Sequence, residues 1–303
     1  MITVKTKRTD LMALKAILKT MRPKQWTKNL IIFAGLIFSL NLFKPPLFVK
    51  TFAAFVVFCL LSGAVYIIND IKDLERDKNH PLKSKRPLAS GELTISSAIL
   101  ALILLIPGSL LVSFMLNPGF GYIAVLYLIL STLYSFYFKH TVILDVLINS
   151  MGFVLRAVAG AVVIQVVISP WLFICTILLA LFLGLGKRRH ELVLLGDGAL
   201  NHRKILEEYS PELLDQMIAV VTASTVMAYS LYTMAPETKE KLHTPYMNLT
   251  IPFVLYGIFR YLYLIHKREE GGDPSLVLLT DKPMLIDVIL WMLTTVILIY
   301  YVH

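Results

Sequence analysis

The stretch from Asn69 to Asp77 carries three aspartates and one asparagine directly after a long apolar segment. Asp70, Asp73 and Asp77 are three and four residues apart, so a continuing helix would present all three carboxylates on one face. Clustered carboxylates repel one another unless a cation neutralises them, and such oxygen ligands suit Mg²⁺. The spacing therefore predicts a Mg²⁺ site formed by these three aspartates, for chemistry on a phosphorylated or pyrophosphorylated substrate.

Cationic side chains follow the aspartates closely. Lys83, Lys85 and Arg86 lie within ten residues of Asp77. A metal that bridges phosphate oxygens, with Lys and Arg neutralising the remaining charge, would suit a pyrophosphate. The alternative is a solvated loop in which the acids and bases simply pair with each other. The regular spacing of the aspartates at the end of an apolar span favours the pyrophosphate site.

A second polar cluster ends another apolar span. Lys187 and Glu191 are four residues apart, and Arg188 and Glu191 are three apart, so a helix would present them together. One interpretation is a positively charged anchor at the membrane surface. The other is a second phosphate clamp that faces the first loop.

The third feature is a polar stripe inside the segment 142–166. Asp145, Asn149, Gly152, Arg156 and Gly160 recur at helical spacing and trace one face. An isolated charge such as Arg156 in an apolar span costs several kcal/mol, and such groups usually face a bundle interior or a cavity. We expect Arg156 to be a phosphate ligand at the floor of a cavity. A buried structural charge is the alternative.

The elements that must position these residues are membrane helices. The chain has 303 residues, 57% hydrophobic and 16% charged, with a mean hydropathy of +0.71, which excludes a soluble globular domain. Apolar segments near the roughly 20 residues that cross a bilayer recur along the whole chain. We expect an all-α integral membrane protein, a single polytopic domain over residues 1–303. The nine expected spans, of which the first is the shortest, are 29–43, 51–69, 95–115, 119–138, 142–166, 170–186, 213–234, 249–266 and 284–302.

The N-terminal residues 1–28 are basic and lack the continuous apolar core of a cleaved signal peptide. Leu14, Leu18 and Met21 recur at helical spacing between basic residues, which indicates an amphipathic helix lying in the membrane interface. A disordered basic tail is the alternative.

Lysine and arginine are distributed unevenly among the loops. Eight precede the first span, six lie between the second and third, and five between the sixth and seventh, whereas the alternate loops are nearly empty. The positive-inside rule then predicts a multi-pass protein of the cell membrane with a cytoplasmic N-terminus. Loops 70–94 and 187–212 fall on the cytoplasmic side and carry the candidate active site. Contact with membrane lipids accounts for the net charge of +9, and nucleic-acid binding is not expected because no soluble basic domain remains.

Taken together, these residues resemble the UbiA superfamily of membrane prenyltransferases. Asn69, Asp70, Asp73 and Asp77 match its first motif, N-D-x-x-D-x-x-x-D, and the similarity spans essentially the whole chain. The resemblance implies a nine-helix bundle around a central cavity that opens laterally to lipid, with cytoplasmic cap loops. It also implies that Mg²⁺ binds a pyrophosphate there.

Prenyl-transferring members usually carry a second motif, D-x-x-x-D, after the sixth span, whereas the run from Gly186 to Leu192 contains one acid, Glu191. The segments 22–29 and 85–91 resemble the phosphoribosyl-transferring branch instead. That branch implies phosphoribosyl pyrophosphate as donor and a polyprenyl phosphate of the decaprenyl type as acceptor. The substrate-binding residues then expected are Lys28, Asn69, Lys83, Arg86, Lys139, Arg156, Lys187, Arg188 and Glu191.

Two other functions stay open on the sequence. An aromatic prenyltransferase, which joins a prenyl diphosphate to a hydroxybenzoate or quinone precursor, shares the fold and the first motif. Glu191 and Asp197 could partly replace its missing acids. A non-catalytic membrane transporter is the other, but the outer halves of the spans are nearly wholly apolar.

Overall fold

The computed structural model describes residues 12–81, 83–167, 169–195, 204–268, 272 and 274–302. Within these ranges it consists of helices and connecting turns without strands. Residues 12–20 form the first helix. The elements of the first half are η1 (Pro23–Phe33), α2 (Ala34–Ile37), α3 (Pro45–Lys72), α4 (Leu74–Lys78), η2 (Lys83–Lys85), α5 (Ile95–Leu116), α6 (Pro118–Phe136), η3 (Phe138–His140) and α7 (Leu144–Val163).

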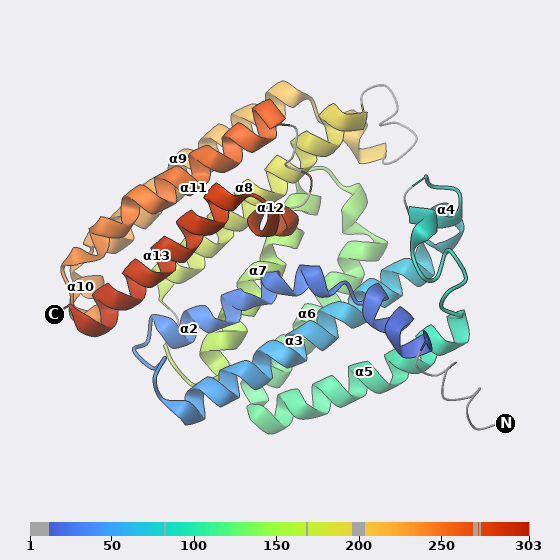
Figure 1. Ribbon diagram of the computed structural model, residues 1–303, viewed down its shortest axis with the longest axis horizontal. Helices are drawn as coiled ribbons and strands as arrows, with labels where there is room; N and C mark the ends of the chain where they lie inside the picture. The colour runs from blue at the N-terminus through green and yellow to red at the C-terminus, as the bar shows by residue number, and fades with distance from the viewer. Residues whose placement is uncertain are drawn as a thin grey trace.

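The second half of the chain continues the bundle. Its long helices lie beside one another in Figure 1, with α9 and α11 along one edge. The elements are α8 (Pro170–Leu195), η5 (Lys204–Glu208), α9 (Pro211–Met234), α10 (Pro236–Leu242), η6 (Tyr246–Thr250), α11 (Ile251–Tyr263), the π-helical turn η7 (Leu264–Arg268), α12 (Pro274–Thr280) and α13 (Lys282–Tyr301).

Short polar residues begin several of the long helices. The side chains of Thr94, Asn117 and Ser210 accept hydrogen bonds from backbone N–H groups in the first turns of α5, α6 and α9. Such caps satisfy donors that a helix leaves unpaired at its start. The apolar runs therefore become helices with defined starts near the membrane surfaces.

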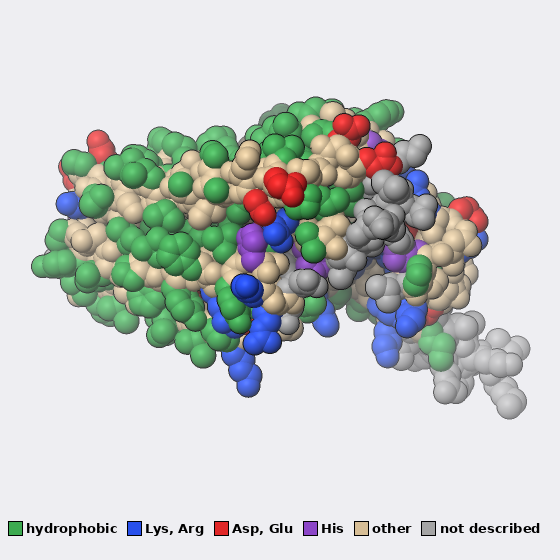
Figure 2. Space-filling view, turned by 90° about the horizontal axis from the view of Figure 1, so that it is seen from above, with side chains coloured by type: hydrophobic (Ala, Val, Ile, Leu, Met, Phe, Trp, Pro, Cys, Tyr) green, Lys and Arg blue, Asp and Glu red, His purple; other side chains and the backbone are tan. Residues whose placement is uncertain are grey.

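Eight helices among the described residues are long and apolar enough to cross a membrane. The chain is therefore an all-α, multi-pass membrane protein, as the composition predicts. These eight correspond to the second through ninth expected spans. In Figure 2 hydrophobic side chains cover much of the left half of the visible face, and charged and histidine side chains gather in the middle and toward the right. In Figure 1 the right-hand end carries α4.

The expected first span, 29–43, is not one of these eight helices. It folds as η1, an 11-residue 3₁₀ helix, followed by the 4-residue α2. This segment packs against α3 and α7, and a Cβ at Gly160 of α7 would collide with the carbonyl oxygen of Ile32. Gly160 is therefore required for the close approach of the two backbones. Contacts with the bundle, rather than length, position this segment.

The two expected cytoplasmic loops are shorter than the sequence suggested. α8 continues past 186 to Leu195, because Lys187 and Arg188 pair with Glu191 along the helix and no helix-breaking residue intervenes. The remainder of this loop up to residue 203, including Asp197, lies outside the described residues. In the loop 70–94, α3 extends to Lys72 and α4 follows at once.

Candidate functional site

The aspartate motif lies at the junction of α3 and α4. Asp73 ends α3, its N–H donates to the carbonyl of Asn69 at 2.9 Å, and its own carbonyl accepts from Asp77 N–H at 2.8 Å. The helical hydrogen-bonding pattern therefore bridges the junction, as the spacing predicts. Asp70 and Asp77 are each only 2% exposed, whereas the Asp73 side chain is 26% exposed.

Two arginines hold the buried aspartates. Arg86 Nη1 lies 3.2 Å from Asp70 Oδ1 and 2.5 Å from Asp77 Oδ2, so a cation already bridges these carboxylates. Arg22, just before η1, donates to Asp70 Oδ1 at 2.5 Å. Arg86, which was expected to bind a substrate phosphate, forms direct ion pairs with the motif, the arrangement that the alternative of paired acids and bases describes. Arg22 belongs to the site although the charge pattern did not select it.

The third aspartate has a different partner. Lys139, in the turn η3 after α6, lies 3.4 Å from both oxygens of Asp73. Among the described residues no three acidic, histidine or cysteine side chains are grouped to hold a metal ion. The donor chemistry still fits a hard divalent cation, because carboxylates are its preferred ligands and a guanidinium nitrogen occupies the position between two of them. The Mg²⁺ ligands named from the sequence stay a prediction.

The second cluster forms around Arg188 of α8. Its Nε lies 2.5 Å from Oδ2 of the fully buried Asp145, its Nη1 donates to Glu191, and its Nη2 donates to Tyr134 Oη at 3.3 Å. Lys187 Nζ lies 3.8 Å from Glu191. Arg188, Lys187 and Glu191 therefore come together as expected, and Asp145 joins them from α7.

Tyr209 completes this cluster. Its hydroxyl donates to Asp145 Oδ1 at 2.9 Å and accepts from Ile143 N–H at 2.7 Å. Ile143 has φ +67° in a tight turn, which a β-branched residue adopts only at a cost in energy, and Tyr209 helps to hold it. Burial raises the pKa of Tyr209 to about 12, so this tyrosine stays protonated. Nothing in the sequence linked Tyr209 to Asp145, 64 residues away.

Lys83 connects the two clusters electrostatically. Burial lowers the pKa of Lys83, and the nearby Arg86 lowers it further. Asp77, Asp73 and Glu191 act in the opposite direction. Because Glu191 is near enough to act on Lys83, the end of α8 lies near the loop after α4. Burial next to other cations leaves Lys83 suited to an additional anion.

Arg156 lies elsewhere, about 16 Å further along α7 than Asp145 at 1.5 Å per residue. Its Nε donates to Asn29 Oδ1 at 2.6 Å and its Nη2 donates to Tyr127 Oη at 2.8 Å. No carboxylate of a described residue forms an ion pair with it. It is 8% exposed, so a buried positive charge stands deep in the bundle with neutral partners only.

The remaining expected residues are partly buried. Lys28 lies in η1, and Asn69 precedes Asp70 in the last turn of α3. The structure thus groups most of the expected residues at one end of the bundle, and separates Arg156 from them.

Comparison with known proteins gives the family. Residues 29–281 match the model of the UbiA prenyltransferase family, so the chain belongs to this family. A protein of Corynebacterium glutamicum named decaprenyl-phosphate phosphoribosyltransferase is 32% identical, over 94% of this chain and 86% of the relative. A protein of the same name from Mycolicibacterium smegmatis is 31% identical, over 94% of this chain and 92% of the relative.

Solved structures agree on the fold. A UbiA homolog from Archaeoglobus fulgidus, bound to GPP and Mg²⁺, superimposes with a TM-score of 0.71. The match covers 94% of this chain and 99% of the other at 20% identity. At that identity the likeness establishes the shared bundle, and the chemistry must be argued from the residues.

Proposed function

We propose that this protein transfers 5-phosphoribose from phosphoribosyl pyrophosphate to a polyprenyl phosphate of the decaprenyl type and releases pyrophosphate. The two relatives that match 94% of this chain are both named decaprenyl-phosphate phosphoribosyltransferase. The observation that carries the proposal is the end of α8, where Lys187 and Arg188 lie across from the aspartate motif and the run from Gly186 to Leu192 contains one acid, Glu191. A donor with three phosphate groups and a lipid phosphate need more cations than a prenyl diphosphate does.

Mg²⁺ is the divalent cation we propose for the donor, with Asp70, Asp73 and Asp77 as the residues that would hold it. Bound there, such an ion neutralises pyrophosphate oxygens and favours departure of this group. Asp73, whose side chain is 26% exposed, is the most accessible of the three.

Basic side chains of the protein bind and orient both phosphoribosyl pyrophosphate and the polyprenyl phosphate. Lys83 and Arg86 neutralise the leaving pyrophosphate, while Lys187 and Arg188 hold the phosphate of the lipid. Lys139 positions Asp73. Lys28, Asn69 and Arg156 are assigned as further substrate contacts, and Arg156 is suited to an anion because its charge has only neutral partners.

The reaction breaks the bond between ribose C1 and the pyrophosphate oxygen and forms a bond from C1 to an oxygen of the lipid phosphate. C1 develops positive charge, as in glycosyl transfer, and attack from the opposite face inverts its configuration. A lipid phosphate is already anionic, so no general base is required. The apolar helices accommodate its hydrocarbon tail, while the phosphate remains near the membrane surface.

The proposal includes an orientation in the cell membrane. The N-terminus and the site face the cytoplasm, because the lysines and arginines concentrate in the segments on that side. The whole chain, residues 1–303, acts as a single membrane domain, and its basic segment 1–28, of which residues 1–11 lie outside the described residues, is assigned to the interface. A soluble donor then reaches the site directly.

A comparison of two substrate pairs, each incubated separately with the protein, tests the activity. The purified protein is incubated with labelled phosphoribosyl pyrophosphate and polyprenyl phosphate, or with prenyl diphosphate and a hydroxybenzoate, in Mg²⁺ or EDTA. We expect a labelled lipid product only from the first pair and only with Mg²⁺. Product from the second pair alone would instead identify an aromatic prenyltransferase.

A further inference from the structure

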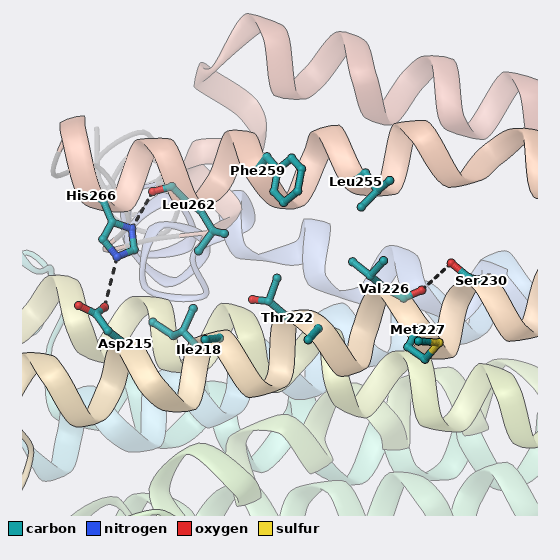
Figure 3. Close-up of a pocket in the computed structure, with 12 residues that line it drawn as sticks. Asp215, Ile218, Thr222, Val226, Met227, Ser230, Leu255, Phe259, Leu262 and His266 are labelled. Carbon is teal, nitrogen blue, oxygen red and sulfur yellow. Dashed lines mark hydrogen bonds and ion pairs between the residues drawn. The ribbon is translucent and has the colours of Figure 1, made fainter.

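A long groove runs between α9 and α11, away from the site described above. Its volume is about 820 Å³. Ile218, Thr222 and Val226 of α9 face Leu255, Phe259 and Leu262 of α11 across it (Figure 3). From Asp215 at one end to Ser230 at the other, α9 rises about 22 Å at 1.5 Å per residue. This length and apolar lining fit one extended hydrocarbon chain. Because the core of a bilayer contains no water, a lipid chain rather than water fills such a groove.

The polar end of the groove carries positive charge. Arg189 of α8 donates to both oxygens of Asp215, from Nε at 2.5 Å and from Nη2 at 3.2 Å. His266 Nδ1 lies 2.9 Å from the carbonyl of Leu262, and its Nε2 lies 3.2 Å from Asp215 Oδ1 (Figure 3). Both ring nitrogens therefore face oxygen acceptors, the carbonyl of Leu262 and the carboxylate of Asp215.

Arg189 and His266 therefore share one carboxylate at this end. The next residues after His266 are Lys267 and Arg268, both exposed, which increase the positive charge. Such a basic cluster at the surface of a membrane attracts anionic lipid head groups. The π-helical turn that carries all three basic residues begins at the end of α11.

One hydroxyl in the groove wall has no partner. Ser224, Thr225 and Ser230 of α9 each donate to a carbonyl four residues earlier. Thr222 does not, and its Oγ1 is buried without a hydrogen-bond partner among the described residues. A buried hydroxyl in this state points to a missing acceptor. Thr222 is about 10 Å along α9 from Asp215.

We propose that this groove is a binding site for one acyl chain of an anionic glycerophospholipid. Its phosphate lies at the cluster of Arg189, Asp215 and His266, and Thr222 Oγ1 donates to the ester carbonyl of the chain. The ester distinguishes this occupant from a polyprenyl phosphate, whose chain has no acceptor below the phosphate. The site is separate from the transfer reaction, but Arg189 directly follows Arg188, so the bound lipid supports the helix end that carries the second cluster.

Lipid retention tests the proposal without any measurement of activity. The full-length protein is stripped of lipid in detergent, mixed with vesicles of phosphatidylglycerol or phosphatidylcholine, re-extracted and analysed by native mass spectrometry. We expect one retained phosphatidylglycerol per chain and about tenfold less phosphatidylcholine, the ratio expected from one charge-assisted contact. Equal retention of the two lipids would overturn the assignment of an anionic head group.

Two matched pairs of variants locate the lipid. Ala219→Phe fills this groove, whereas Ala53→Phe fills the second groove between α3 and α5. We expect only the first to abolish retention. Thr222→Val removes the unpaired hydroxyl and should reduce retention about fivefold, whereas Thr225→Val removes one already bonded within α9 and should not.

The hydroxyl variant keeps the test decisive if Ala219→Phe misfolds, which circular dichroism would reveal. Thr222→Ser should restore retention. Unchanged retention in Thr222→Val, or displacement of phosphatidylglycerol by an equal amount of polyprenyl phosphate, would overturn the proposal.

Discussion

Asp145 on α7 and Arg188 on α8 form a buried ion pair, with Arg188 Nε 2.5 Å from Asp145 Oδ2. The aspartate is fully buried and the arginine side chain is 6% exposed. The pair fixes the end of α8 against the start of α7, and Tyr209 donates to the same carboxylate. Arg188 is the ion-pair partner of the fully buried Asp145, and without Asp145 it would keep only the more exposed Glu191, so the two residues should depend on each other strongly.

A double-mutant cycle tests this dependence. We expect Asp145→Leu and Arg188→Met each to destabilise the protein by about 3 kcal/mol, because each removes the buried counter-charge of the other residue. Asp145→Leu with Arg188→Met should recover much of that loss but no transferase activity. Thermal unfolding in one detergent, followed by activity, measures both. Additive losses in the double variant would contradict the coupling.

The most exposed motif residue, Asp73, is the sharpest test of the aspartate site. Asp73→Asn should reduce turnover by a factor on the order of 100 or more without changing the unfolding temperature, because it removes a charge from the proposed metal site while keeping the shape. Glu75→Gln is the matched control, since Glu75 lies in the same segment but points to Lys78. Near wild-type turnover in Asp73→Asn would refute the role of the motif.

Lys83 should make donor binding sensitive to alkaline pH. Burial and Arg86 lower the pKa of Lys83, so its ammonium loses its proton at lower pH than the ordinary value of about 10.4. The KM for phosphoribosyl pyrophosphate should therefore begin to rise below that pH. Lys83→Arg keeps its charge and should flatten this rise, whereas Lys83→Ala should raise KM at every pH. An identical pH profile in Lys83→Arg would exclude Lys83 as the cause.

The pair of Arg260 and Asp281 should stabilise the protein at neutral but not at acidic pH. Hydrogen bonds from Arg260 lower the pKa of Asp281 below its ordinary value of about 3.9. The stabilising contribution is complete above that ordinary value and is lost as pH falls through the lowered one. Asp281→Asn can still cap α13, so it removes only the charge. At pH 7 it should reduce the free energy of unfolding by about 1 kcal/mol and so lower the unfolding temperature, whereas at strongly acidic pH it should have no effect. A constant difference across this range would rule out the ion pair as the source.

Sequence patterns predicted the local features of the site well. Asp70, Asp73 and Asp77 keep the spacing of one helical stretch, and Lys187, Arg188 and Glu191 lie on one helix, because both sets depend on contacts three or four residues apart. Arg22 was visible only as part of a resemblance, and Tyr209 gave no signal. Their partners are 48 and 64 residues away, a separation that periodicity does not report.

The first span was the least accurate expectation about the fold. Its composition suits a membrane helix, but η1 is a 3₁₀ helix whose position depends on the glycine of a different segment, Gly160. Arg156 was likewise expected on a polar stripe, which α7 contains, but its partners Asn29 and Tyr127 come from η1 and α6.

The amino-acid sequence by itself determined the approximate extent of the eight long membrane helices, although it predicted a ninth at 29–43, and the presence of the aspartate motif. Both follow from hydrophobic runs and short-range helical spacing, which are properties of neighbouring residues. Only the tertiary structure decided which charges meet. It directs Arg86 to two aspartates, Arg188 to Asp145 and Arg189 to Asp215, because a charge buried among packed helices must find its counter-charge on whichever helix packing brings close.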